Sequence, residues 1–141
     1  MIELNTDFWT YPSDYKCITT NGVVKSNGEL VMGKGVALKA KQLFPSLPRK
    51  LGNLVKLYGN QPFLLKEEKI ISFPTKIHWI DKSSLNLIED SAKKIVLICK
   101  DFGNVVITLT RPGCGNGGCD WREVKKVIEN ILDDRFIVCH K

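Results

Sequence analysis

The stretch from Val105 to Thr110, VVITLT, contains only β-branched and apolar residues, and a glycine-rich loop follows shortly after it. An uninterrupted run of this kind is typical of a strand that is buried on both faces of a sheet. After the loop, residues 120–132 place their apolar side chains on one face of a helix, with Asp120 and Glu123 as a capping pair. A buried strand, a glycine-rich loop and a helix in this order indicate an α/β fold.

Strands and helices alternate along the rest of the chain. Runs of apolar and β-forming residues predict strands at 1–4, 15–20 and 135–140, and two short strands around a turn within 62–75. Apolar residues at spacings of three and four predict helices over 34–44 and 85–102, and a short helix with a connector within 46–59. Ser83 or Ser84 can cap the helix over 85–102. We therefore expect one domain over residues 1–141, a three-layer α/β/α sandwich with a mixed, mostly parallel sheet.

Composition and charge narrow the class of protein. The 141 residues suffice for one domain with a core, the N-terminal stretch lacks a secretory signal, and no apolar run is long enough to cross a bilayer. Five cysteines without a C-x-x-C pair indicate reduced thiols, so we expect a cytoplasmic protein without a metal site. The net charge of +6 suits an anionic ligand such as a nucleotide or a nucleic acid, but it is also typical of a solvated lysine-rich surface.

The stretch Gly28–Gly35, GELVMGKG, matches most of the phosphate loop of nucleoside triphosphatases. That loop requires an apolar strand before its first glycine and a hydroxyl after its lysine, whereas VKSN precedes Gly28 and Gly35 follows Lys34. The remaining feature is Gly33-Lys34-Gly35 at the start of a helix, where a close backbone and unpaired N–H groups can bind phosphate without magnesium. The alternative is a tight turn that binds no ligand.

The stretch Gly113–Gly118, GCGNGG, is a G-x-G-x-x-G sequence between a predicted strand and a predicted helix. A dinucleotide-binding Rossmann unit also needs an acidic residue at the end of the next strand, which here ends in His140 and Lys141. We therefore expect a nest of amide donors for a diphosphate and no cofactor. Both glycine loops, Asn21 and Thr75-Lys76 follow predicted strands, so they are expected to border one crevice at the carboxyl ends of the strands.

With its loops interpreted in this way, the chain resembles the macrodomain family, which binds ADP-ribose. The resemblance rests on Asp7, the Asn21 turn, VMGKGVALKAKQLFP, FPTKIHW and RPGCGNGGCDW. It is strongest to the branch of the terminal ADP-ribose glycohydrolase of animals and to bacterial antitoxin macrodomains that remove ADP-ribose from DNA. The resemblance implies that Asp7 and Phe8 recognise adenine, Asn21 holds the distal ribose and the two loops hold the diphosphate. The implied ligand-binding residues are Asp7, Phe8, Asn21, Met32, Gly33, Lys34, Gly35, Val36, Gly113, Cys114, Gly115, Asn116, Gly117, Gly118 and Cys119.

The resemblance also implies that Lys76, the lysine of FPTK, is catalytic and that Asn21 orients the sugar. A lysine attacks carbon only as the free amine, so we expect apolar surroundings or the charge of Lys34 to disfavour its protonated form. The sequence departs from the family pattern at two places. Gly117 occupies the position of an aspartate that the animal enzymes use, and the antitoxin type shares this glycine. In the first loop, MGKG replaces the GGG of other branches.

Three functions remain open at this stage. The chain could hydrolyse ADP-ribosyl linkages to a protein carboxylate or a nucleobase, bind ADP-ribose without chemistry, or remove phosphate from ADP-ribose 1″-phosphate. The expected partners are ADP-ribose or an ADP-ribosylated protein or DNA, together with a toxin, and we expect a monomer that does not bind membranes. His78 could relay a proton or have a surface or capping role, and Trp79 and Trp121 could wall the pocket but are expected in the core.

Overall fold

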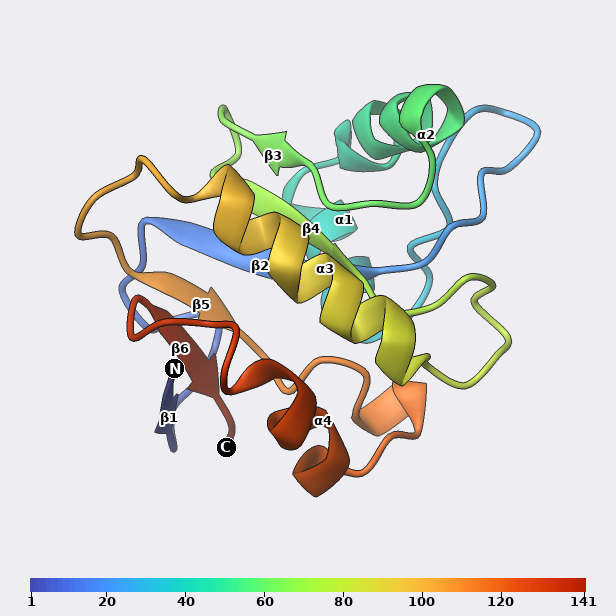
Figure 1. The fold of residues 1–141 in the computed structure, drawn as a ribbon. Helices are drawn as coiled ribbons and strands as arrows, with labels where there is room; N and C mark the ends of the chain where they lie inside the picture. Colours follow the sequence, from blue (N-terminus) through green and yellow to red (C-terminus); the bar gives the residue numbers. More distant parts are fainter.

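Six strands form the central sheet of the computed structural model, which describes residues 1–141 (Figure 1). They are β1 (Ile2–Leu4), β2 (Tyr15–Thr20), β3 (Leu64–Leu65), β4 (Ile70–Pro74), β5 (Ile107–Leu109) and β6 (Phe136–Cys139). Their order across the sheet is β1-β6-β5-β2-β4-β3. Every neighbouring pair is parallel except β3 and β4, which are antiparallel. The predicted mixed, mostly parallel sheet is therefore confirmed.

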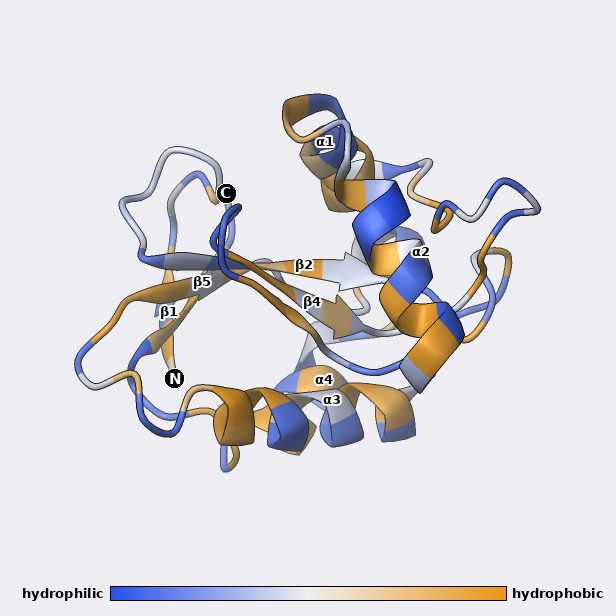
Figure 2. Ribbon diagram, turned by 90° about the horizontal axis from the view of Figure 1, so that it is seen from above, coloured by the Kyte–Doolittle hydropathy of each residue, from blue (hydrophilic) through white to orange (hydrophobic).

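Helices cover both faces of this sheet. They are α1 (Gly35–Leu43), α2 (Leu47–Tyr58), α3 (Leu85–Ile98) and α4 (Trp121–Ile128), with a single 3₁₀ turn, η1, at Gly115–Gly117. Figure 2 shows α1 and α2 on one face of the sheet and α3 and α4 on the other. This arrangement confirms the predicted three-layer α/β/α sandwich. None of the α-helices is long and apolar enough to span a lipid bilayer.

Two hydrophobic clusters hold the layers together, one on each side of the sheet. The first joins α3 and α4 to the sheet through Ile88, Ile95 and Val124, all of which are fully buried. The second joins α1 and α2 to the opposite face through Ala40 and Leu51. Because each helix buries one apolar face against the sheet, its polar face remains in water, as the apolar spacing in the sequence predicts.

The helix caps follow the sequence closely. Ser84 is the N-cap of α3 and accepts a hydrogen bond from the Leu87 N–H at 3.2 Å. Asp120 caps α4 by accepting from the Arg122 N–H at 2.8 Å, so its expected role as a cap is confirmed. The Glu123 carboxylate makes no return bond to the Asp120 N–H, so the expected capping pair is only half present. Each capping side chain accepts a hydrogen bond from an N–H group that would otherwise have no partner at the start of the helix.

Some predicted elements differ in length. Residues 46–59, predicted as a short helix with a connector, form the 12-residue helix α2, because Leu47 and Leu51 lie one turn apart and are both buried. The predicted strand at 105–110 is longer than the observed strand β5. Val106 lies outside β5, because its backbone forms hydrogen bonds with the loop before β2 and not with a neighbouring strand. Its N–H donates to the Asp14 carboxylate at 2.7 Å and its carbonyl accepts from the Asp14 N–H at 2.8 Å. The helix predicted to reach residue 102 ends at Ile98.

Candidate functional site

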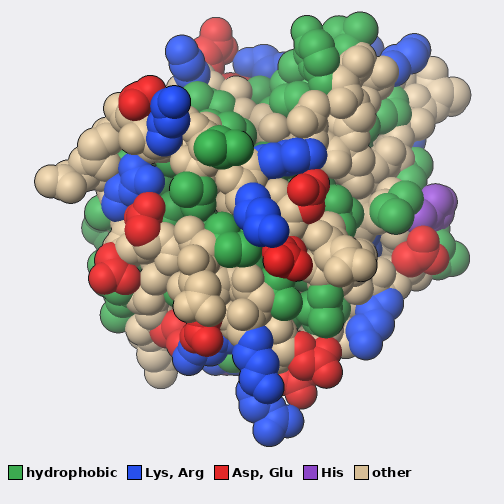
Figure 3. Space-filling model, in the orientation of Figure 1, with side chains coloured by type: hydrophobic (Ala, Val, Ile, Leu, Met, Phe, Trp, Pro, Cys, Tyr) green, Lys and Arg blue, Asp and Glu red, His purple; other side chains and the backbone are tan.

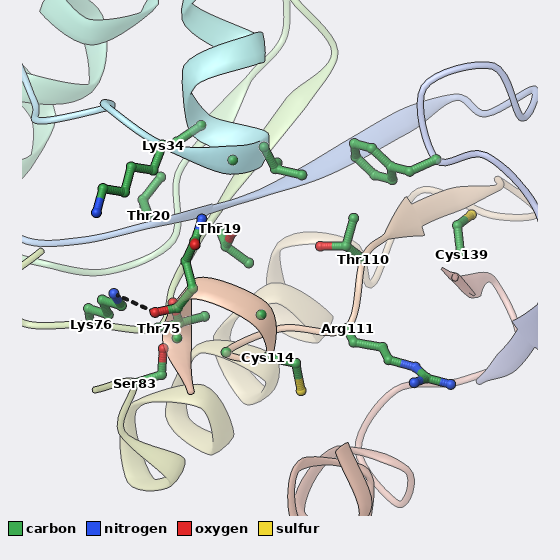
Figure 4. Close-up of a pocket in the computed structure, with 18 of the residues that line it drawn as sticks. Thr19, Thr20, Lys34, Thr75, Lys76, Ser83, Thr110, Arg111, Cys114 and Cys139 are labelled. Atoms are coloured by element: carbon green, nitrogen blue, oxygen red, sulfur yellow. Dashed lines mark hydrogen bonds between the residues drawn. The ribbon is translucent and has the colours of Figure 1, made fainter. Parts of the chain in front are cut away.

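A cavity of about 960 Å³ opens at the carboxyl ends of β2, β4, β5 and β6. Its volume lies within the range of about 300–1,000 Å³ that is common for small-molecule sites. Figure 4 shows side chains from several separate segments of the chain around it. Of the residues proposed from the sequence, the cavity is lined by Asp7, Phe8, Asn21, Gly33, Lys34, Gly35, Val36, Lys76, Gly113, Cys114, Gly115, Asn116 and Gly117. The predicted crevice at the ends of the strands is therefore present.

The two glycine loops meet across this cavity. A Cβ atom on Gly35, which has a φ of +58°, would lie 3.1 Å from the side-chain nitrogen of Asn116 in the second loop. Gly35 begins α1, and neither a side-chain cap nor an acidic residue occupies the first turn of that helix. Its N–H groups are thus available to an anion, and Gly115 to Gly117 form a second turn on the opposite side. Two sets of backbone donors can hold one diphosphate between them.

Three proposed residues, and Gly28 of the first glycine stretch, lie elsewhere. Met32 is buried in the core between the sheet and α1, and Cys119 is buried under α3, where its thiol contacts the Ser83 carbonyl at 3.4 Å. Gly118 also does not line the cavity. Gly28 belongs to a separate hairpin turn that packs closely on α2. A Cβ atom on Gly52 of α2 would lie only 2.0 Å from the Gly28 carbonyl oxygen. The stretch GELVMGKG is therefore not one loop, and only its last part reaches the cavity.

The Asn21 side chain forms two hydrogen bonds to the backbone of the segment between β2 and α1. Its side-chain nitrogen donates to the Val31 carbonyl at 2.9 Å, and its oxygen accepts from the Val23 N–H at 3.0 Å. A carboxamide has two N–H groups and two lone pairs, so one donor and one acceptor position remain for a ligand. Asn21 is thus held in a fixed orientation at the cavity wall.

Lys76 lies between the end of β4 and the second glycine loop. Its Nζ donates to the carbonyl of Asn116 at 3.3 Å, the bond that is dashed in Figure 4. It also donates to the carbonyl of Trp79 at 3.2 Å. Lys76 itself is partly exposed, and the neighbouring Ile77 and Ile80 are 72% and 71% exposed. The side chains of Lys34 and Lys76 extend to the same side of the cavity, as Figure 4 shows.

The backbone of Lys76 is held from two sides. The Asn60 side chain donates to the Lys76 carbonyl at 3.0 Å, and the Gly22 N–H donates to the Ile77 carbonyl at 3.0 Å. A Cβ on Gly22 would lie 2.8 Å from the Asn60 amide nitrogen, so the two segments approach each other very closely. This contact determines the direction in which the Lys76 side chain leaves the main chain.

The segment around Asp7 and Phe8 forms the opposite end of the cavity. The Asp7 carboxylate accepts from the Trp9 N–H at 2.7 Å, and Lys16 donates to the Phe8 carbonyl at 2.9 Å. Burial lowers the pKa of Lys16 below its ordinary value. These contacts fix the loop, and one carboxylate oxygen of Asp7 is left to accept from a ligand.

The cysteines of the cavity are not reactive nucleophiles. Burial raises the pKa of the Cys114 thiol and that of the Cys139 thiol above the ordinary value. Both therefore remain protonated at neutral pH. No group of three or more His, Cys, Asp or Glu side chains is arranged to hold a metal ion.

Two tryptophans predicted to fill the core line the cavity instead. Trp79 is 46% exposed, and Trp121 donates from its indole nitrogen to Glu3 at 3.0 Å while it also packs against the core below α4. His78 does not line the cavity, and its Nδ1 accepts from the Ile80 N–H at 3.2 Å. The capping role considered for His78 is thus present, and nothing in the structure supports a proton relay.

Other cavity residues were not singled out from the sequence. Ser83 is 7% exposed, and its hydroxyl has no hydrogen-bond partner. The Nε of Arg111 is likewise buried without a partner, and its guanidinium lies 5.2 Å from the ring of Trp121. Thr20 and Thr110 also line the cavity, together with Thr75, which the sequence already placed at the crevice. Thr20 ends β2, and Thr110 and Arg111 are the two residues after β5, so their place at a strand end is the signal by which they could have been found.

Known proteins similar to this chain contain the same fold. No protein-family model matches the sequence. A DNA ADP-ribosyl glycohydrolase from Thermus aquaticus is 34% identical over 114 residues, which are 73% of this chain and 31% of the relative. A DNA ADP-ribosyl transferase–DNA ADP-ribosyl glycohydrolase fusion protein from Thermosipho africanus is 30% identical over 115 residues, covering 64% of this chain and 30% of the relative. The chain thus spans about a third of the length of the curated relatives that it matches.

Solved structures agree with these sequence matches. The macrodomain of Thermus aquaticus DarG is 28% identical and superposes with a TM-score of 0.79, covering 99% of this chain and 97% of its own. Thermosipho africanus DarTG in complex with ADP-ribose is 24% identical with a TM-score of 0.82, covering 99% of this chain and 41% of its own. The sequence and fold together show that the chain belongs to the macrodomain family, in the branch that contains the DarG macrodomains.

Proposed function

We propose that the chain binds ADP-ribose in this cavity and hydrolyses the bond between ADP-ribose and DNA. The observation that carries the proposal is the convergence of two backbone turns on one cavity with the amine of Lys76 beside them. The names of the relatives support DNA as the modified molecule. The ADP-ribose held by a structure of the same fold supports the ligand.

The ligand would lie along the length of the cavity. Adenine would meet Asp7 and the Phe8 backbone, and the diphosphate would lie between the α1 N-terminus and the η1 turn. The distal ribose would then reach Asn21 and Lys76, at the end of the cavity opposite to Asp7. Holding the reacting groups in a fixed orientation can supply a large part of an enzyme's rate enhancement.

Lys76 is the group proposed to act on the sugar. Its nitrogen would form a bond to the anomeric carbon, C1″, while the bond from C1″ to the DNA base breaks. The electron pair of that bond leaves with the base, which takes up the proton that the amine loses. Water then cleaves the lysine adduct and releases ADP-ribose. Asn21 would hold the 2″ and 3″ hydroxyls during both steps.

Three substrates offered side by side test this function. Purified protein should release ADP-ribose from an ADP-ribosylated oligonucleotide and show micromolar-class calorimetric binding to free ADP-ribose. An ADP-ribosylated glutamate peptide and ADP-ribose 1″-phosphate should react more slowly. Binding without release from any substrate would favour the non-catalytic module, and phosphate release from ADP-ribose 1″-phosphate would favour the phosphatase.

Asn60 is expected to position Lys76 for this reaction. Replacing Asn60 with alanine removes the 3.0 Å bond to the Lys76 carbonyl and leaves that backbone group free to move. We expect kcat to fall about tenfold, since a small misplacement of a catalytic group is costly, while affinity for ADP-ribose stays the same. Steady-state turnover and calorimetry would measure both. Asn53→Ala on the exposed side of α2 is the matched control, and equal loss in both variants would contradict the assignment.

We also propose a domain organisation, a location and a partner for this chain. We propose that residues 1–141 act as one monomeric domain, because both core clusters pack on the same sheet. All five cysteines are unpaired, which supports a reducing cytoplasmic location. A relative in which a DNA ADP-ribosyl transferase is fused to the glycohydrolase supports a transferase toxin as partner.

A further inference from the structure

The segment between β4 and α3 exposes an unusual amount of apolar surface beside the cavity. Ile77 is 72% exposed, Trp79 46% and Ile80 71%. In Figure 3 hydrophobic side chains gather beside a histidine at the right edge of the molecule, where Figure 1 places this segment. A contiguous apolar patch of this kind is typical of an interaction site.

The apolar side chains are held in place by the backbone. The Ile77 carbonyl accepts from the Gly22 N–H at 3.0 Å, and the Asp81 N–H donates to the His78 carbonyl at 3.1 Å. The Ile80 N–H donates to the His78 ring at 3.2 Å, which closes the turn. Ile77 and Ile80 are therefore presented to solvent by a closed turn, and a partner would not need to order it on binding.

Trp79 connects this turn to the reacting end of the cavity. Its side chain lines the cavity, and its carbonyl holds the Lys76 amine at 3.2 Å. Its ring lies 5.3 Å from the His78 ring at an angle of 33°. A group attached to the sugar at Lys76 must therefore leave the cavity past an aromatic surface.

Lysines lie on the cavity side of this surface. Lys34 lines the cavity, and the carbon chain of Lys82 packs beside Gly118 of the second glycine loop, with its Cγ 3.5 Å from the position of a Cβ there. Asp81 is the one acidic residue between Lys76 and Lys82. Aromatic and apolar side chains interleaved with lysines suit unpaired nucleotides, whose bases stack and whose phosphates meet cations.

We propose that residues 77–82 form a docking surface for the nucleotides that flank the modified base in an unpaired strand. This proposal rests on the proposed function, since it places the strand by the position of Lys76. A base within a duplex cannot bring its attached sugar to the cavity, because the paired strand and stacked neighbours surround it. An unpaired strand can lay its neighbouring bases on Ile77 and Ile80 while its phosphates approach Lys82.

The double variant Ile77→Ser/Ile80→Ser tests the surface without touching the cavity. The KM for an ADP-ribosylated single-stranded oligonucleotide should rise about tenfold, because the flanking bases lose the apolar surface that they contact. Turnover of an ADP-ribosylated mononucleoside, which has no flanking nucleotides, should stay unchanged. Leu97→Ser is the matched control, because Leu97 is 68% exposed on α3 and lies outside residues 77–82. It should change neither value.

A second measurement separates this proposal from the proposed function. Fluorescence anisotropy with an unmodified single strand reports docking even if no substrate is turned over, and the double variant should weaken that binding about tenfold. Failure of the wild-type chain to release ADP-ribose would count against the proposed function alone. An unchanged affinity for the unmodified strand, or an equal rise in KM for an ADP-ribosylated peptide, would overturn the docking surface.

Discussion

Replacing Lys76 with alanine is expected to reduce ADP-ribose release from modified DNA by between about 100-fold and 10,000-fold, the range that a positioned catalytic group contributes. The loss follows from the geometry, because Lys76 is the amine that reaches both the Trp79 carbonyl and the Asn116 carbonyl at the cavity edge. Affinity for free ADP-ribose should change little, since backbone groups of the two loops would hold the diphosphate. Single-turnover assays and calorimetry measure the two effects separately.

Two further variants define the role of this amine. Lys126→Ala removes an exposed lysine of α4 outside the cavity and should leave turnover unchanged. Lys76→Arg keeps a positive charge but supplies no free amine, because guanidinium does not lose its proton in proteins. It should be as inactive as the alanine variant. An active arginine variant would show that the group acts through its charge, and an active alanine variant would remove Lys76 from the mechanism.

Replacing Gly117 with aspartate is expected to lower the free energy of unfolding by about 2 kcal/mol and to abolish ADP-ribose binding. A Cβ on Gly117 would lie 2.3 Å from the Ser83 hydroxyl oxygen and 3.1 Å from the Ser83 Cβ. Gly117 is not among the glycines with a positive φ, so its backbone conformation would accept a side chain. The obstacle is therefore Ser83, and the second glycine loop must shift when both side chains are present.

A double-mutant cycle tests this explanation. Ser83→Gly removes both clashing atoms, so the Gly117→Asp change should be much less destabilising in that background. Urea unfolding and calorimetry would report stability and binding, and Gly33→Ala is the control for stability alone, since nothing lies within 4 Å of a Cβ there. Strictly additive effects of Ser83→Gly and Gly117→Asp would show that the strain arises elsewhere. If the coupling is found, the aspartate of the animal enzymes cannot be introduced into this site by a single substitution.

The sequence predicted the elements that depend on neighbouring residues. Ser83 or Ser84 was expected to cap α3 and Asp120 to cap α4. Ser84 and Asp120 have these roles, because a cap bonds an N–H two or three positions further along the same chain. The fold class followed from one buried strand, β5, and from the alternation of strands with helices. The length of α2 was underestimated, because its stability comes from Leu47 and Leu51 packing in the core rather than from helix propensity.

The site was predicted less completely than the fold. The resemblance to macrodomains pointed to Lys76 and the two glycine loops, and these residues do border one cavity. Met32 and Cys119 lie within the same motifs but are buried in the two core clusters. Trp79 and Trp121 were expected in the core on the basis of residue type, and nothing local distinguishes a cavity wall from a core position.

The sequence by itself determined that the chain forms an α/β sandwich with two glycine turns at the ends of strands, because glycine conformation and apolar periodicity are properties of short segments. The tertiary structure alone decided that Gly35 lies beside Asn116, that Ser83 fills the space next to Gly117, and that residues 77–82 are exposed at the cavity mouth. Contacts of this kind join segments that are far apart in the chain. They depend on strand order and on the packing of side chains across the sheet, which no local pattern of residues encodes.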